Sequence, residues 1–280
     1  MNRGTVFYKL TGSGNDFIAL DGRYVDRSQL SAELIRAICD RRFGAGADGL
    51  MLLDPNADEP AHFTFHFWNS DGSEGPMCGN GALCATRLAT AIELAPAEGE
   101  VVFATRAGLH RGRVVDGVPE IVLPDCRSPQ PVAVRLGPGE REAHLGTPSV
   151  PHLVVLVDDV AKVDVDGRGT PLRHDPALGP GGANVNWVSP AGDGTFRMRT
   201  FERGVEGETL ACGTGAVACA LVLEGKGMAQ SPARIWTRSG LPLDITWKRE
   251  SGDRISGIRL RGEGRIVYKG ILGELLTPIK

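Results

Sequence analysis

The segments Cys78-Gly-Asn-Gly-Ala-Leu83 and Cys212-Gly-Thr-Gly-Ala-Val217 repeat one pattern within a chain of 280 residues. Glu74 and Glu208 precede the two cysteines at the same spacing. An internal repeat is the sequence signature of a structural unit that occurs more than once. We therefore expect the chain to consist of two similar halves.

Weaker matches extend the repeat upstream of both cysteines. Asn15-Asp16 precedes the apolar run 17–20, as Pro151-His152 precedes the apolar run 153–156. A turn-rich stretch at residues 124–131 separates the halves. We therefore predict an N-terminal domain over residues 1–126 and a C-terminal domain over 127–265. We expect residues 266–280 to cross back and complete the first domain.

Short strand-like segments separated by Gly, Pro and Asp dominate the chain, and three segments have helical periodicity. The predicted strands include Val101–Ala104, Val132–Leu136, Leu153–Val157, Arg197–Phe201 and Arg265–Ile271. The predicted helices are Ser31–Asp40, Gly81–Leu94 and Gly215–Leu223. Two of these helices begin at a Cys-Gly-x-Gly turn. Much of the chain is therefore expected to be sheet, in an α/β (α+β) fold.

Charge and hydropathy restrict the class of partner. The formal net charge of −3 argues against a nucleic-acid or anionic-membrane surface, which usually carries a concentrated excess of Lys and Arg. The apolar runs are far shorter than the roughly 20 residues that cross a bilayer. Residues 1–10 lack the apolar stretch of a signal peptide. We expect a cytoplasmic protein that binds a small molecule.

The six cysteines point to free thiols, because disulfide frameworks belong to secreted chains. Cysteine is often a small buried apolar residue, and we interpret four of the six in that way. These four are Cys39, Cys84, Cys126 and Cys219. Cys78 and Cys212 differ, because each stands in the repeated context at a predicted helix start.

A thiol beside the free N–H groups of a helix N-terminus should ionise readily, because partial positive charge favours the anion. One thiolate can then remove a proton from one face of a carbon while a second thiol returns one to the other face. Fixed backbone donors would stabilise the carbanion. Cys78 and Cys212 therefore predict cofactor-independent inversion of a carbon centre, with no metal and no Schiff base.

The chain resembles the diaminopimelate epimerase family over nearly its whole length. The motifs that carry the resemblance are Gly12–Phe17, Arg42–Gly49, Asn69–Glu74, Cys78–Ala82, Pro151-His152, Asn184, Glu202-Arg203 and Ala211–Gly215. The resemblance implies a cofactor-independent epimerase that interconverts LL- and meso-diaminopimelate for lysine and cell-wall precursor synthesis. It also implies a homodimer. The implied fold has two pseudo-symmetric domains, each a curved, mostly antiparallel sheet around a central helix, with the active site in the cleft between them.

The resemblance also assigns site residues. The proton-transfer pair falls on Cys78 and Cys212, with His152 and Glu202 as supporting acid–base and positioning groups. The implied substrate contacts are Asn15, Asn69, Gly79, Asn80, Asn184, Glu202, Arg203, Gly213 and Thr214. From the residues alone, Asn15 and Asn184 fit turn positions equally well, and His152 fits a buried core histidine.

Two positions depart from the family pattern. Some members carry Gln where Gly49 stands and Asn where Val150 stands, so two polar substrate contacts are absent here. The alternative function is a related cofactor-independent racemase or epimerase for a histidine-, lysine- or proline-type substrate. A second charged end on the substrate, favoured by Glu202-Arg203, argues against proline.

Two other classes of site fit the sequence poorly. Gly44-x-Gly46-x-x-Gly49 matches a dinucleotide-binding fingerprint, but a predicted helix precedes it and a strand-like segment follows, the reverse of the required order. A zinc-binding module would need closely spaced ligand pairs. The cysteine spacings from Cys78 to Cys84 and from Cys212 to Cys219 are too long for that.

Overall fold

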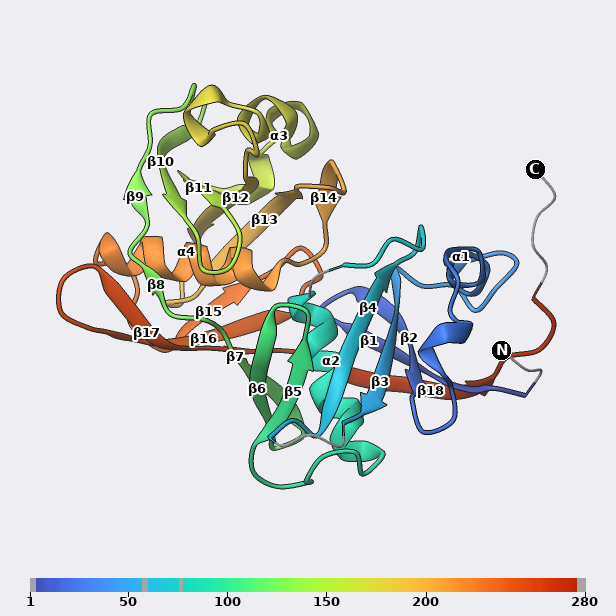
Figure 1. Ribbon diagram of the computed structural model, residues 1–280. Coiled ribbons are helices and arrows are strands. Elements are labelled where there is room, and N and C mark those ends of the chain that lie inside the picture. Colours follow the sequence, from blue (N-terminus) through green and yellow to red (C-terminus); the bar gives the residue numbers. More distant parts are fainter. Residues whose placement is uncertain (1–3, 57–59, 76–77, 276–280) are drawn as a thin grey trace. The chain divides into compact units, whose positions relative to one another are not determined.

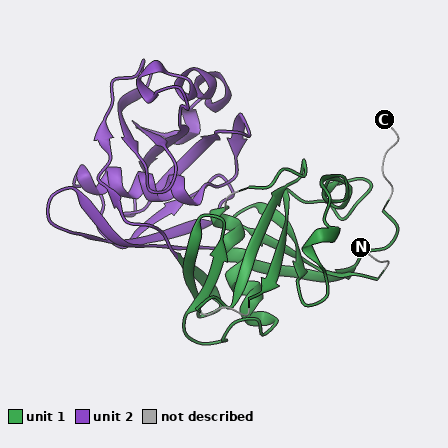
Figure 2. Cartoon of the chain, viewed as in Figure 1, with its two compact units in different colours: residues 1–121, 263–280 green, residues 122–262 purple. Residues whose placement is uncertain are grey.

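A computed structural model describes residues 4–56, 60–75 and 78–275 (Figure 1). The chain divides into two compact units (Figure 2). Unit 1 comprises residues 1–121 with 263–280, and unit 2 comprises residues 122–262. The domain limits expected from the sequence, 1–126 with 266–280 and 127–265, stay a prediction, and their ends at 1–3 and 276–280 lie outside the described residues.

Unit 1 is a sheet with one helix against it and a second, shorter helix. Its strands are β1 (Val6–Gly12), β2 (Asn15–Asp21), β3 (Gly49–Pro55), β4 (Phe63–Asn69), β5 (Val101–Thr105), β6 (Gly108–Val115), β7 (Val118–Val122) and β18 (Arg265–Ile271). Its helices are α1 (Ala32–Cys39), α2 (Gly79–Ala91) and the 3-10 turn Arg27–Gln29. The strands pair in the order β18–β1–β2–β3–β4–β5–β6–β7, and only β2/β3 and β4/β5 are parallel.

Unit 2 has the same plan. Its strands are β8 (Cys126–Arg127), β9 (Gln130–Pro131), β10 (Glu140–Gly146), β11 (His152–Val157), β12 (Asn184–Pro190), β13 (Phe196–Glu202), β14 (Gly207–Thr209), β15 (Ala233–Trp236), β16 (Pro242–Arg249) and β17 (Arg254–Arg261). Its helices are α3 (Val165–Arg173), α4 (Gly213–Gly225) and the 3-10 turns Val160–Lys162 and Pro176–Leu178. Antiparallel pairs dominate, with β11/β12 and β13/β15 parallel.

The two units repeat each other strand by strand. In each, a hairpin leads into a parallel pair and then an antiparallel pair: β1–β2–β3–β4 in unit 1 and β10–β11–β12–β13 in unit 2. The register matches as well, since Phe17 pairs with Gly49 in one unit and His152 with Asn184 in the other. The predicted α/β fold with two similar, mostly antiparallel halves is confirmed.

The helices α2 and α4 are the central helices of their units. Each contacts several strands of its own sheet, and each buries small residues that allow close packing. From Ala216 to Leu223, α4 is apolar on every side, as expected of a helix that is enclosed by the core. Each helix begins at the glycine directly after its cysteine, so the cysteine that precedes each helix is held by a buried element.

One predicted strand is wrong, and one helix was missed. Val132–Leu136 is not a strand, because side chains take the backbone groups that a neighbouring strand would use: Arg135 N–H donates to Asp175 and its carbonyl accepts from Arg168. Helix α3 was not anticipated, since it contains two glycines and Pro171. Its N-cap Asp164 accepts from the Gly167 N–H and compensates for the weak propensity.

The helices expected from the sequence are confirmed, with shifted ends. The Gly44-x-Gly46-x-x-Gly49 segment lies between α1 and β3, so it has the helix-then-strand order that does not suit a dinucleotide. No helix within residues 4–56, 60–75 and 78–275 is long and apolar enough to span a membrane.

Candidate active site

Cys78 is the N-cap residue of α2. Its backbone is extended, and its sulfur accepts a hydrogen bond from the Gly81 N–H at 3.5 Å. The N–H groups in the first turn of a helix have no partner within the helix, and they carry partial positive charge. The side chain is partly exposed. The structure therefore places this thiol where an anion is favoured, as the sequence predicted.

Asn80, in the first turn of α2, is tied to Asn15. Its Nδ2 donates to Asn15 Oδ1 at 2.8 Å, and Asn15 Nδ2 in turn donates to Asp48 at 3.2 Å. Asn15 follows a two-residue hairpin turn, Ser13-Gly14, in which both residues have positive φ. The tight turn therefore brings two of the predicted substrate-binding amides into contact.

An ion-pair network lies behind Asn15. The Asp16 carboxylate accepts from Arg41 at 2.6 Å and from Lys9 at 2.6 Å, and Arg41 also donates to Asp48 at 2.7 Å. Burial alone would raise the pKa of Asp16, but the hydrogen bonds from Arg41 and Lys9 outweigh it and lower the pKa to about 2. The carboxylate that supports the hairpin is thus ionised at neutral pH.

Asn69 ends β4 and is exposed. Its Nδ2 donates to the Ser73 hydroxyl at 3.0 Å, within the tight turn that follows the strand. In unit 1, therefore, Asn15 and Asn80 contact each other, whereas the Asn69 side chain donates a hydrogen bond within its own turn. Asn69 pairs with Gly49 across β3 and β4.

Phe67 accounts for glycine at position 49. A Cβ on Gly49 would lie 2.8 Å from the Phe67 ring and 2.7 Å from the Trp68 carbonyl oxygen. A Cβ on Gly75 would also lie 2.8 Å from the same ring, which is nearly buried. The side chain that some family members carry at position 49 therefore has no room here, because the Phe67 ring fills the space.

Cys212 is the N-cap residue of α4 and is buried. Its sulfur lies 3.7 Å from the Thr214 hydroxyl, and Thr214 Oγ1 lies 2.9 Å from His152 Nε2. His152 is fully buried at the start of β11. Burial, aided by the positive charge of Arg203, lowers the pKa of His152 to about 3, so the ring is neutral near pH 7.

Asn184, Glu202 and Arg203 lie together at the ends of β12 and β13. Asn184 Oδ1 accepts from the Arg203 N–H at 2.8 Å, and its Nδ2 donates to the Pro151 carbonyl at 3.3 Å. Burial raises the pKa of the Glu202 carboxyl, and Thr209 opposes the rise. Asn184 thus holds the backbone that carries the Glu202-Arg203 pair.

Burial dominates the electrostatics of the other four cysteines. Burial raises the pKa of Cys39 to about 12 and raises the pKa of Cys84, Cys126 and Cys219 as well. Cys126 is half-buried, and the other three are buried. Within the described part of the chain, no group of three or more His, Cys, Asp and Glu side chains is arranged to hold a metal ion.

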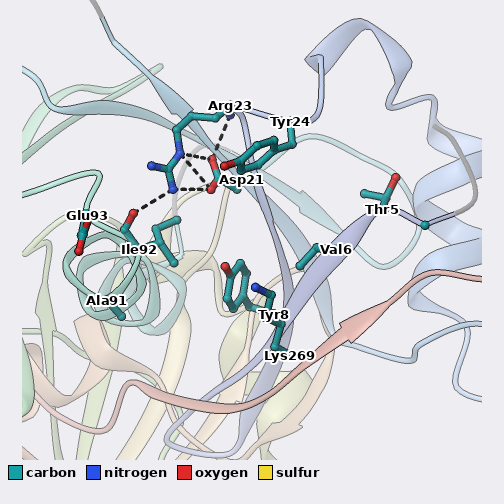
Figure 3. Close-up of a pocket in the computed structure, with 11 residues that line it drawn as sticks. Thr5, Val6, Tyr8, Asp21, Arg23, Tyr24, Ala91, Ile92, Glu93 and Lys269 are labelled. Atoms are coloured by element: carbon teal, nitrogen blue, oxygen red, sulfur yellow. Dashed lines mark hydrogen bonds and ion pairs between the residues drawn. The ribbon is translucent and has the colours of Figure 1, made fainter.

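A cavity of about 570 Å³ lies in unit 1 between the end of α2, β1 and Lys269 of β18 (Figure 3). Arg23 crosses it, donating to Asp21 at 2.7 Å and to the Ile92 carbonyl at 2.9 Å. None of the residues predicted for the site lines this cavity. The Asp21–Arg23 pair joins the end of β2 to the C-terminus of α2, which is a structural role.

Two buried polar residues beside the site were not predicted. Asn186 and Thr200 pair across β12 and β13 and are completely or almost completely buried. Asn186 Nδ2 lies 3.1 Å from His152 Nδ1, and Thr200 donates to Asn186 Oδ1 at 3.0 Å. The available signal was an Asn within a strand-like segment rich in apolar residues, where an unpaired buried amide would be costly.

The chain is similar in sequence to diaminopimelate epimerases. A model of the family described as diaminopimelate epimerase matches residues 7–118 and 147–263. The chain is 45% identical over 279 residues to the diaminopimelate epimerase of Gemmatimonas aurantiaca, with 96% of this chain and 99% of that protein covered. It is 38% identical over 279 residues to the diaminopimelate epimerase of Aquifex aeolicus, with 96% and 98% covered.

Among solved structures, a putative phenazine biosynthesis protein from Clostridium difficile has a TM-score of 0.71 and 12% sequence identity, with 95% of this chain and 98% of that chain covered. At that identity the likeness shows the fold alone. The two diaminopimelate epimerases are far more similar to this chain in sequence, and they match nearly its whole length. With a family model that matches both halves, and with the repeated cysteine context within the matched residues, this chain belongs to the diaminopimelate epimerase family.

Proposed function

We propose that Cys78 and Cys212 are the paired base and acid that invert one α-carbon of LL-diaminopimelate to give the meso form. One thiolate takes the α-proton, so that an S–H bond forms as the C–H bond breaks and the electron pair passes toward the carboxylate. The second thiol then gives its proton to the opposite face of the carbon. The observation that carries this proposal is that both thiols cap buried helices in a duplicated setting.

The helix starts supply the electrostatic part of the proposal. Removing an α-proton leaves charge on the neighbouring carboxylate, and preorganised donors in a dry site stabilise such charge strongly. Gly79-Asn80 and Gly213-Thr214 open the two helices, where N–H groups lack helical partners. We infer that these residues bind the carboxylate and amine of the reacting end.

We assign the distal end of the substrate to Asn15, Asn69, Asn184, Glu202 and Arg203. The guanidinium of Arg203 suits a bidentate grip on a carboxylate. The Arg203 backbone is held by Asn184 at 2.8 Å, which restrains the start of its side chain. We infer that Glu202 receives the distal amine. Burial raises the pKa of its carboxyl. A bound ammonium would lower that pKa again.

Family membership supports an isomerase of lysine and peptidoglycan-precursor biosynthesis, and it does not favour the alternative of another amino-acid substrate. We also propose a cytoplasmic homodimer that needs neither pyridoxal phosphate nor a metal ion. Apolar side chains exposed on β18, at Val267, Tyr268 and Ile271, support a second copy as partner. Light scattering across a dilution series measures the molar mass and so tests the dimer. A monomer mass at every concentration would exclude it.

The deciding experiment is incubation of the protein with LL-diaminopimelate in D₂O, followed by proton NMR. We expect formation of the meso form with deuterium at the inverted carbon, at a rate that neither a chelator nor added pyridoxal phosphate changes. Cys78→Ala and Cys212→Ala should abolish inversion. Cys126→Ala, which removes a half-buried thiol outside the proposed site, is the matched control and should keep the full rate. Normal inversion by both alanine variants would refute the two-thiol mechanism.

A further inference from the structure

We infer that Asn186 is a positioning residue that holds His152 in a single tautomer and so directs a hydrogen-bond donor at the Cys212 sulfur. The inference rests on the proposed role of Cys212 in proton transfer. It concerns a residue that is fully buried on β12 and outside the predicted substrate contacts.

The orientation of the Asn186 side-chain amide is determined on both sides. Its Nδ2 donates to the Leu153 carbonyl at 3.2 Å, and its Oδ1 accepts from the Thr200 hydroxyl at 3.0 Å. Rotating the amide by half a turn would set its oxygen against the Leu153 carbonyl oxygen, and neither atom has a proton to share. The NH₂ group of Asn186 therefore faces β11.

The same NH₂ group determines where His152 carries its proton. Nδ2 lies 3.1 Å from His152 Nδ1, and an amide nitrogen can only donate. Nδ1 must therefore accept the hydrogen bond and carries no proton. Since burial keeps the ring neutral near pH 7, its single proton resides on Nε2.

From Nε2 the hydrogen bonds run in one direction. The Nε2–H group donates to Thr214 Oγ1 at 2.9 Å, which leaves the hydroxyl proton of Thr214 to point at the Cys212 sulfur, 3.7 Å away. A hydrogen bond donated to a thiolate favours the ionised form. In the other tautomer Thr214 would donate to the ring instead, and an oxygen lone pair would face the sulfur.

Gly215 is the residue that makes this arrangement possible. A Cβ at that position would lie 2.3 Å from Asn186 Oδ1, a distance that no side chain tolerates without movement. The matching Gly81 of the first motif has no such neighbour, since its Cβ would meet Cys78 at 3.4 Å and the Phe65 ring at 3.5 Å. The second glycine of the Cys212 motif therefore has a specific function, which is to admit the Asn186 amide.

The first test observes the tautomer directly. Nitrogen-15 histidine labelling and long-range proton–nitrogen correlation distinguish a protonated from a bare ring nitrogen, and His152→Gln assigns the signal among the six histidines. We expect Nε2–H in the wild-type protein near pH 7. Asn186→Asp should shift the proton to Nδ1, because a carboxylate only accepts. A wild-type ring with its proton on Nδ1, or with both nitrogens protonated, would overturn the inference.

The second test measures rates. Asn186→Asp should lower kcat about tenfold to a hundredfold, the effect of losing one hydrogen bond to a charged group in the transition state, with KM nearly unchanged. Ser189→Ala is the matched control on β12, because it removes another buried hydrogen bond, from the Val160 N–H, and should leave kcat unchanged. Equal kcat values for Asn186→Asp and Ser189→Ala would also overturn the inference.

Two further outcomes separate this inference from the proposed function. If Asn186→Asp does not fold, Thr200→Val provides a second variant, because it removes the donor to the Asn186 oxygen at nearly constant volume. Thr200→Val should also lower kcat, by less than the loss expected for Asn186→Asp. If the wild-type ring carries Nε2–H but the protein does not epimerise diaminopimelate, the tautomer supports the inference while the proposed function fails.

Discussion

The starts of α2 and α4 share one sequence pattern but have different surroundings. At α2 the Cys78 sulfur lies 3.5 Å from the Gly81 backbone nitrogen, and Gly81 faces the Phe65 ring. At α4 the Cys212 sulfur lies 3.7 Å from the Thr214 hydroxyl, and Gly215, the counterpart of Gly81, faces the Asn186 amide. The duplicated backbone therefore carries an apolar support in one unit and a polar support in the other.

Strand register identifies the counterparts, and it moves the match suggested by the sequence by one residue, so that Phe17 and not Asp16 corresponds to His152. Because β2 and β11, β3 and β12, and β4 and β13 match, Phe17, Met51 and Phe67 of unit 1 occupy the positions of His152, Asn186 and Thr200 of unit 2. The apolar set is packed edge to face, with the Phe17 and Phe67 ring centroids 6.0 Å apart. We expect the Cys212 thiol to depend on the polar set as well as on its helix start, whereas the side chains of the apolar set have no N–H or O–H group to donate.

The largest expected effect separates the two thiols. Cys78→Ser and Cys212→Ser should each lose inversion by at least about a thousandfold, the upper range for a positioned acid or base. Each variant should still exchange the α-proton of one stereoisomer with D₂O, because the remaining thiol reaches only one face. Mass spectrometry of LL- and meso-diaminopimelate after incubation measures this. Equal exchange of both isomers by either variant would contradict a one-face assignment for each thiol.

A reciprocal substitution tests the polar support. His152→Phe gives unit 2 the residue that unit 1 carries at the matching position, and it should lower kcat about tenfold to a hundredfold through loss of the bond to Thr214. Phe17→Leu removes aromatic packing in unit 1, and it should cost about 1 kcal/mol of stability with kcat unchanged. Steady-state rates and thermal melting of both variants give the answer. Equal kcat values for His152→Phe and Phe17→Leu would contradict the proposed difference between the units.

The packing around Phe67 predicts a large stability effect. Gly49→Gln should destabilise unit 1 by about 3 kcal/mol, because the new Cβ collides with the Phe67 ring and the Trp68 carbonyl. Combining it with Phe67→Ala should recover part of that loss, since only the ring contact is relieved. Urea unfolding of the single and double variants measures the coupling. Simple additivity would show that the ring is not what excludes a side chain at position 49.

The smallest expected effect concerns pH. The pKa of Asp16 falls from 3.8 to about 2 in the folded protein, so its contribution to stability is present above pH 3.8 and is lost as the pH falls through about 2. Because the carboxylate is partly exposed and its ion pairs are screened by solvent, Asp16→Asn should cost only about 1 kcal/mol at pH 7 and progressively less below pH 4. Unfolding free energies of both proteins across this pH range test it. If the difference in unfolding free energy does not change with pH, it arises from packing and not from the charge of Asp16.

Much of the fold followed from local patterns. The repeat predicted two similar halves, and the Cys-Gly-x-Gly turns predicted the starts of α2 and α4, because glycines and apolar periodicity are local signals. Val132–Leu136 failed as a strand because its partners are distant side chains, from Asp175 and Arg168. No window of sequence contains that competition.

The candidate site divides in the same way. The sequence by itself determined that two cysteines would cap two buried helices, because the residues that make a helix start are neighbours along the chain. Only the tertiary structure decided that His152 on β11 and Asn186 on β12 would lie behind the Thr214 hydroxyl that faces Cys212. Hydrogen-bond partners are chosen by which atoms meet across adjacent strands, and the register of β11, β12 and β13 brings them together.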